Sequence, residues 1–272
     1  MNESTAKYLA GLLDADGSLS FHFKRSETRQ DRFYMGLILK LTAADAVDRD
    51  RYVEKLPLLT GFGQVHREGK LGQFCNWTVS KRADLEMLLP RLIKHMIIKA
   101  QHWQWLLDMW RDLRRMPRTN DGSFSVSERE MEELKEASKH SRRLRVGPLK
   151  AKNFPTWAWL AGYLDGDGSY VFRYDKVQNY WSMRVSAVAH INDVSVLEFL
   201  QRSFGGSVID HGQSTGCKVW YRSLGVRDAS FALRFLPKLA KHSKLKRYRI
   251  DRMIHYHRQR LSDSAPTGEA TV

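Results

Sequence analysis

Two aspartates, Asp16 and Asp167, stand at equivalent positions of a nine-residue sequence that the chain contains twice. Residues 9–17 read Leu-Ala-Gly-Leu-Leu-Asp-Ala-Asp-Gly and residues 160–168 read Leu-Ala-Gly-Tyr-Leu-Asp-Gly-Asp-Gly, so seven of nine positions are identical at an offset of 151. Two carboxylates brought together repel each other, and a divalent cation relieves that repulsion. Mg²⁺ takes carboxylate, carbonyl and water oxygens and leaves positions for a phosphate. A metal held there would activate water and stabilise the leaving oxygen of a phosphodiester.

Small residues in the same motif predict how the two aspartates meet. Gly11 and Ala15 lie four residues apart, as do Gly162 and Gly166, so each pair shares one face of a helix. Glycine inside a helix costs roughly 0.5–1 kcal/mol relative to alanine. The pattern therefore indicates two helices in close contact. Their C-terminal ends, with exposed carbonyl groups, would bring the two aspartates together.

The first acid of each copy, Asp14 or Asp165, is not expected to join such a centre. On a helix it lies two residues, about 200°, from the second acid, so the two side chains face different directions. A single Asp-x-Asp-Gly could simply end a helix and start a turn. Two copies in matched contexts on a strongly basic chain argue against that simple interpretation.

The similarity extends downstream of the motif and predicts a duplication of about 110 residues, not a short-period solenoid. The matched segments are 61–63 with 204–206, 77–80 with 220–223, and 89–95 with 236–242. Lys99 and Lys246 each follow a matched proline by nine residues. These two lysines therefore occupy equivalent positions of the repeat.

Each half predicts the element order αββαββα, which places the chain in the α+β class. In the first half we expect helix 6–16, strands 18–26 and 33–42, helix 45–58, strands 62–67 and 73–80, and one or two helices over 83–115. In the second half we expect helix 155–167, strands 169–175 and 180–190, helix 192–203, strands 207–211 and 217–223, and one or two helices over 227–260.

The repeat also sets the expected domain boundaries: 1–117 form the first repeat, 118–153 a linker, 154–261 the second repeat, and 262–272 a flexible tail. The linker is polar, and Ser127 with Glu130 forms a capping-box signature, which predicts a short surface helix. The tail is small and polar, which is typical of a poorly ordered terminus.

Charge points to a polyanionic partner. The chain has 45 Lys and Arg residues against 30 Asp and Glu residues, a formal net charge of +15. Nucleic acid is the usual partner of so basic a protein, and an anionic membrane surface is the less usual one. No apolar run approaches the roughly 20 residues of a membrane span. The two cysteines, Cys75 and Cys217, form neither a metal motif nor a disulfide framework.

Residues 9–17 and 160–168 closely resemble the signature of the LAGLIDADG homing endonuclease family. The first copy departs from it at Leu13, and the second at Tyr163, Leu164 and Gly166. The resemblance covers both repeats, most of residues 5–260. It implies two pseudo-symmetric repeats with saddle-shaped antiparallel sheets and the motif helices packed at the centre. It further implies a monomer that cuts double-stranded DNA at a long, specific site.

The same resemblance implies roles for individual residues. Asp16 and Asp167 would bind Mg²⁺ or another divalent cation such as Mn²⁺, and the residue before each would add its backbone carbonyl. Those preceding residues are Ala15 and Gly166. Family members keep a basic residue near the scissile phosphates, for which Lys99 and Lys246 are the candidates. The paired His95 and His242 are the alternative, and a solvated helix face is the plain interpretation of the lysines.

The paired strands are expected to read DNA, because a two-stranded ribbon fits the major groove. Their polar side chains alternate with apolar ones, so one face would lie on DNA and the other on the helices. The expected DNA-binding residues of the first half are Ser18, Ser20, His22, Lys24, Tyr34, Lys40 and Thr42. Those of the second half are Ser169, Arg173, Asp175, Tyr180, Ser182, Arg184, Ser186 and His190. Because the two sets differ, the target should be asymmetric. Basic residues of the last helix are also expected to touch phosphates.

Other interpretations stay open at this point. A maturase of the same fold would bind intron RNA without needing both aspartates, and a non-catalytic DNA-binding regulator would normally lose them; both are present. An unrelated basic enzyme with a chance repeat is disfavoured by the repeat length, and an intein by the lack of a terminal His-Asn. With no secretory or transit leader in view, we expect an intracellular protein of an intron-bearing compartment, such as an organelle.

Overall fold

The computed structural model describes residues 1–27, 31–44, 47–69, 74–113, 125–142, 155–176, 180–210, 216–225 and 228–263. The chain divides into two compact units, Met1–Gly166 and Asp167–Val272. Unit 1 therefore contains the first repeat together with the motif helix of the second. The expected tail, 262–272, lies almost wholly outside the described residues. No helix within the described ranges is long and apolar enough to span a membrane.

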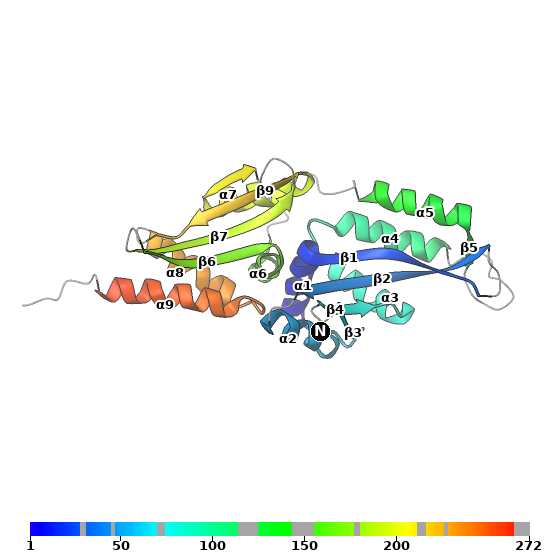
Figure 1. Ribbon diagram of the computed structural model, residues 1–272, viewed down its shortest axis with the longest axis horizontal. Coiled ribbons are helices and arrows are strands. Elements are labelled where there is room, and N and C mark those ends of the chain that lie inside the picture. The colour runs from blue at the N-terminus through cyan, green and yellow to red at the C-terminus, as the bar shows by residue number, and fades with distance from the viewer. Residues whose placement is uncertain are drawn as a thin grey trace, which may run out of the picture. The chain divides into compact units, whose positions relative to one another are not determined.

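Unit 1 is an antiparallel sheet with helices, drawn from blue to green in Figure 1. Its elements are α1 (Glu3–Asp16), β1 (Gly17–Arg25), β2 (Arg32–Ala44), α2 (Val47–Thr60), β3 (Gln64–Glu68), β4 (Phe74–Val79), α3 (Arg82–Ile93), α4 (Ala100–Leu113), β5 (Ser125–Ser127), α5 (Glu128–Ser141) and α6 (Trp157–Gly166). The strand order is β1-β2-β4-β3, and β5 pairs with β2.

Unit 2 repeats that pattern without a counterpart of β5 and α5 among its described residues. Its elements are β6 (Gly168–Asp175), β7 (Tyr180–His190), the 3₁₀ turn η2 (Ile191–Asp193), α7 (Val194–Phe204), β8 (Ser207–Asp210), β9 (Cys217–Ser223), α8 (Ala229–Ala240) and α9 (Arg247–Asp263). The strand order β6-β7-β9-β8 matches that of unit 1. The predicted α+β class and the repeated element order are confirmed.

The strands form where polar and apolar residues alternate. In unit 1, Leu19 of β1 pairs with Leu39 of β2, and both are buried, while their neighbours Ser18 and Lys40 pair on the opposite face. In unit 2, Tyr170 pairs with Val185 in the same way. Successive side chains of a strand point to opposite faces, so this alternation buries one face and leaves the other available for contacts.

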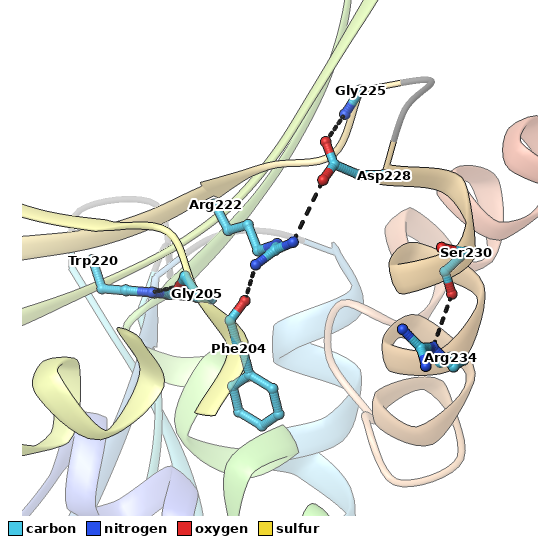
Figure 2. Close-up of polar contacts among 8 residues, drawn as sticks. All are labelled: Phe204, Gly205, Trp220, Arg222, Gly225, Asp228, Ser230 and Arg234. Atoms are coloured by element: carbon cyan, nitrogen blue, oxygen red, sulfur yellow. Dashed lines mark hydrogen bonds and ion pairs between the residues drawn. The ribbon is translucent and has the colours of Figure 1, made fainter. Parts of the chain in front are cut away.

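Equivalent tryptophans hold equivalent glycine turns in the two units. The Trp77 indole donates to the carbonyl of Phe62 at 3.0 Å, and the Trp220 indole to that of Gly205 at 2.8 Å. Figure 2 shows the second contact beside Arg222, whose guanidinium donates to the carbonyl of Phe204. Both turns contain glycine at positive φ, for example Gly206 at 91°, a conformation that other residues rarely adopt. The matched segments of the repeat therefore build the same local structure.

Residues 125–141 are more tightly bound to unit 1 than a linker would be. The capping box predicted at Ser127 and Glu130 is present. The helix is not confined to the surface, because Met131 and Leu134 are buried with Val126. These three residues pack against apolar side chains of β1, β2 and α4: Phe21, Phe23, Phe33, Met35, Met109 and Leu113. Composition suggested a solvated segment because its apolar residues are few, but they lie on one face.

The two motif helices, α1 and α6, pack backbone to backbone within unit 1. A Cβ placed on Gly11 would overlap the carbonyl oxygen of Trp159, and one on Gly162 would overlap that of Tyr8. Only glycine leaves room for the opposite helix at both points. The close contact predicted from the small residues is confirmed.

Replacing Gly162 with alanine should lower the free energy of unfolding by about 3 kcal/mol, because the new methyl group meets fixed backbone atoms. Gly36→Ala is the matched control, since nothing lies within 4 Å of a Cβ at that position of β2. Urea denaturation measures both variants. Equal stabilities would contradict the close approach of α1 and α6.

Candidate metal centre and nucleic-acid interface

The two acids of the first motif copy lie in different environments. Asp16 is the last residue of α1 and its side chain is exposed. Asp14, two residues earlier, is 2% exposed. Two residues turn a helix by about 200°, so the side chains leave α1 in nearly opposite directions. The expectation that the acids would not face the same point is confirmed for this copy.

Asp14 joins three parts of unit 1. Its carboxylate accepts hydrogen bonds from the backbone N–H groups of Ile97 and Lys99, at 2.7 and 2.8 Å, and from the Trp159 indole at 2.9 Å. Burial raises the pKa of Asp14, while these donors and the charge of Lys99 act in the opposite direction. Asp14 thereby connects α1 to the segment after α3 and to α6.

The first acid of the second copy makes the reciprocal contact. Asp165 is fully buried and accepts a hydrogen bond from the Tyr8 hydroxyl at 2.8 Å. Tyr8 and Trp159 are equivalent in the repeat, so each helix sends an aromatic donor to the other helix's first acid. Burial, followed by the charge of Asp165, raises the pKa of the neighbouring Tyr52 above its usual range.

Lys99 caps the C-terminal end of α1. Its Nζ donates to the carbonyls of Leu13, Ala15 and Gly17 at 3.0, 2.9 and 2.8 Å. An ammonium group has three protons, and these three bonds use all of them. The cation also offsets the partial negative charge at the helix end. In unit 2 the equivalent Lys246 donates to the carbonyl of Gly168, directly after the motif aspartate.

The alternative basic residue, His95, lies at the wrong end of α1. Its Nε2 is 3.3 Å from the Glu3 carboxylate in the first turn. Thirteen residues of helix separate that turn from Asp16, about 20 Å. His95 therefore does not reach the end of α1 that carries Asp16. Burial lowers the pKa of His95 and also of its counterpart His242, where Lys241 and Lys244 add to the effect.

The structure brings together three of the four residues expected to hold a metal. A Cβ on Gly166 would overlap the Cβ of Ala15 and lie 3.2 Å from Oδ2 of Asp16. The end of α6 therefore borders the carboxylate of α1. The fourth residue, Asp167, directly follows Gly166 in the chain and belongs to unit 2, where its carbonyl accepts from the Val188 N–H at 3.2 Å.

The donors at this end of α1 fit a hard divalent cation. Asp16 offers an exposed carboxylate, and the Ala15 carbonyl, which already accepts from Lys99, keeps a second lone pair. Within the described residues, no cluster of three or more His, Cys, Asp or Glu side chains could hold a metal ion. A cation here would need further oxygen ligands from water, backbone or phosphate, as Mg²⁺ commonly does.

The predicted polar face of β1 and β2 exists as one surface. Ser18 pairs with Lys40, His22 with Gly36 and Lys24 with Tyr34, all on the side opposite the buried leucines. Ser20 and Thr42 belong to the same alternation. This face continues onto β3 and β4, where Lys40 aligns with Thr78 and Thr78 with Gln64.

Sequence reasoning missed two further polar residues in this register, His66 and Asn76, of which Asn76 is fully buried. Thr42 donates to the Asn76 side chain at 2.7 Å, and Glu68 lies 3.2 Å from the Lys40 ammonium. Period-two alternation in 64–68 and 74–79 was the signal that could have found them.

The polar face of unit 2 follows the predicted alternation with one exception. Ser169 pairs with Ser186 and Arg173 with Ser182, and Arg173, Arg184 and His190 are exposed. Ser186 itself is 8% exposed, because it lies on an inner strand between Ser169 and Tyr221. Asp175 and Tyr180 pair through their backbones, and their side chains lie outside what the structure describes. Tyr221, Ser207 and Ser223 extend the face and were missed.

The basic residues of α9 do not belong to this face. Tyr256 of α9 packs on Phe172 of β6, with ring centroids 5.6 Å apart. Phe172 and Arg173 are successive strand residues and so point to opposite sides of the sheet. α9 therefore lies on the side of the sheet opposite Arg173, and contact between its basic residues and phosphates stays a prediction.

The two acids of the first copy should respond differently to the same substitution. Asp14→Asn is expected to lower the free energy of unfolding by about 2 kcal/mol or more, because an amide cannot accept all three buried hydrogen bonds. Asp16→Asn should leave stability unchanged, because the side chain is exposed at a helix end that disfavours negative charge. Thermal denaturation of the two variants checks this, and a larger loss for Asp16→Asn would reverse the assignment.

Solved structures share this fold at low sequence identity. The LAGLIDADG homing endonuclease I-GzeII, in complex with a DNA target, has a TM-score of 0.71 at 15% identity, covering 97% of this chain and 93% of that one. I-SmaMI bound to cleaved DNA has a TM-score of 0.69 at 17% identity, covering 99% and 93%. I-AabMI bound to uncleaved DNA has a TM-score of 0.67 at 15% identity, covering 97% and 92%. No protein-family model and no curated protein matches the chain. The chain thus has the fold of the LAGLIDADG homing endonucleases over nearly its whole length.

Proposed function

We propose that this protein is a site-specific endonuclease that hydrolyses both strands of duplex DNA at a long asymmetric target, using a divalent cation. The main supporting observation is the end of α1, where Asp16 is exposed beside Ala15 and Gly166 while its neighbour Asp14 is buried in structural hydrogen bonds. The hydrogen bonds of Asp14 already hold the end of α1 in place. An exposed acid two residues later is therefore not needed to end the helix.

The proposed metal ligands are Asp16 and Asp167, with backbone carbonyls of Ala15 and Gly166. When bound, Mg²⁺ or Mn²⁺ would supply activated water and charge stabilisation at the phosphate. Lys99 and Lys246 are the proposed basic residues of the site. Because Lys99 already donates to three carbonyls, we assign it first the task of orienting the end of α1.

The polar faces of the two sheets are the proposed DNA-reading surfaces. A two-stranded antiparallel ribbon fits the major groove, and the side chains of these faces include donors and acceptors for base edges. Unit 1 presents Lys40 beside Glu68, whereas unit 2 presents Arg173 and Arg184. Different chemistry in the two units favours an asymmetric target. The structural neighbours I-GzeII and I-AabMI are bound to DNA, which agrees with duplex DNA as the partner. Because one chain carries both repeats, we expect it to act as a monomer.

The direct test is to incubate the purified protein with a randomised duplex-DNA library, with Mg²⁺ or with EDTA, and to sequence the cut ends. We expect metal-dependent cutting at one long, imperfectly palindromic sequence. Asp16→Asn or Asp167→Asn should abolish cutting and preserve binding, because each removes one charged ligand. Glu133→Gln, an exposed acid of α5 that contacts Arg129, is the control and should cut normally.

Three outcomes would redirect the proposal. Binding without cutting would leave a DNA-binding regulator. Competition of that binding by intron RNA would indicate a maturase. Cutting that survives both aspartate substitutions would refute the two-aspartate centre even if the nuclease activity is real.

Arg184→Ala should weaken binding of the duplex target and reduce the slope of log affinity against log salt by about 1, because one phosphate contact is lost. Arg234→Ala, an exposed arginine of α8, is the matched control and should change neither quantity. Fluorescence anisotropy at several salt concentrations measures both. An equal effect of the two substitutions would exclude a dedicated polar face.

A further inference from the structure

Unit 2 contains an open aromatic cavity that the proposed nuclease does not use. It lies between the sheet and α9 and has a volume of about 600 Å³. Four rings line it, those of Phe172, Trp181, Tyr248 and Tyr256, together with Arg252 and His255. That volume falls within the range of pockets that bind small organic groups.

The rings form an ordered cluster with cations over their faces. Phe172 and Trp181 stack with centroids 4.4 Å apart at an interplanar angle of 10°. The Arg252 guanidinium lies 5.3 Å from the Phe172 centroid, and Arg249 lies 5.6 Å from that of Tyr248. The Tyr248 side chain is 47% exposed. A large aromatic ring open to solvent beside guanidinium groups is a typical surface for stacking a nucleobase.

The charged residues that line the cavity are Arg252 and Asp251, and α9 carries further arginines. Of the charged side chains of α9, Asp251 is paired with Arg247 at 3.0 Å. Four other arginines of the helix are exposed: Arg249, Arg252, Arg258 and Arg260. These side chains lie on the side of the sheet opposite Arg173, so a duplex on the polar face would not account for them. Positive charge next to stacking rings complements a phosphate next to a base.

Unit 1 covers the equivalent surface with its own chain. There Phe21 and Phe23, the counterparts of Phe172 and Tyr174, are packed beneath Val126, Met131 and Leu134. Unit 2 keeps the aromatic residues but leaves Tyr174 40% exposed. At the helix position equivalent to Trp105 in α4 it has Arg252, so a charge replaces an apolar side chain. This difference favours a polar, anionic occupant over a second apolar helix.

We propose that this cavity and the adjoining surface of α9 bind unpaired nucleotides of a single-stranded nucleic acid. A base would stack against Tyr248 and Trp181, and Arg252 with its neighbours would contact the phosphates. The chain's own residues 264–272 are an unsuitable occupant, because they include no aromatic ring that could stack on those of the cavity. This site is independent of Asp16, Asp167 and the polar faces.

The test uses the Asp16→Asn protein in EDTA, so that no strand is cut. Fluorescence anisotropy is recorded with a short unstructured RNA, with DNA of the same sequence, and with the corresponding duplex. We expect the protein to bind both single strands, and a tighter RNA complex would identify recognition of the 2′-hydroxyl. Tyr248→Ala should weaken single-strand binding about tenfold, whereas Tyr248→Phe should preserve it, because stacking requires the ring and not the hydroxyl.

Two arginine variants separate this site from general charge effects. Arg252→Gln should weaken single-strand binding and reduce its salt slope by about 0.7. Arg234→Gln on α8 removes the same charge elsewhere in unit 2 and should have no effect. Duplex binding should be the same in the Tyr248→Ala and parent proteins, so failure of this proposal and failure of the nuclease proposal are distinguishable.

Several results would overturn the proposal. Single-strand binding that is unchanged in both Tyr248→Ala and Arg252→Gln would exclude the cavity. Loss of that binding in Arg184→Ala alone would place single strands on the polar face. Sedimentation equilibrium gives the remaining alternative: a dimer that Tyr248→Ala dissociates would show that a second copy covers the cavity.

Discussion

The contact between the backbones of α1 and α6 determines the arrangement of the candidate site. Gly11 and Gly162 each face a carbonyl of the opposite helix, and no side chain separates the two helices at those points. At this short separation the indole of Trp159 reaches Asp14 and the hydroxyl of Tyr8 reaches Asp165. The same approach places the end of α6 against Ala15 and Asp16. Glycine's cost inside a helix is therefore offset by a contact that no larger residue permits.

Each motif copy places two acids two residues apart, a buried one and the one proposed to bind the metal. The first acid is buried and accepts hydrogen bonds from the other helix, which fixes the rotation of the helices about their axes. In the first copy the second acid, Asp16, is then left exposed at the helix end, where Lys99 donates to the carbonyls of its two chain neighbours, Ala15 and Gly17. A buried carboxylate is tolerated because its hydrogen bonds offset much of the cost of removing it from water. The metal chemistry proposed for the exposed acid depends on this fixed geometry.

The two units use the sides of their sheets differently, although their strand orders are the same. Both have a polar face with a matching register. On the other side, unit 1 covers its aromatic residues with β5 and α5, whereas unit 2 surrounds them with arginines of α9 and leaves tyrosine rings exposed. The two units thus share one surface and differ in the other.

The sequence by itself determined the local features: the duplication, the element order, the alternation of side chains along the strands and the close contact of the motif helices. These depend on periodicities of two and about four residues, which are visible in a linear chain. Tertiary structure decided which polar residues are buried and what each charge contacts. It placed Lys99 on three carbonyls, His95 at the far end of α1, Ser186 between two strands, and Met131 and Leu134 in a core. Those outcomes depend on neighbours that are distant in the sequence. A polar residue is stable either in water or buried against a suitable partner, so composition and spacing do not show which of these environments it has.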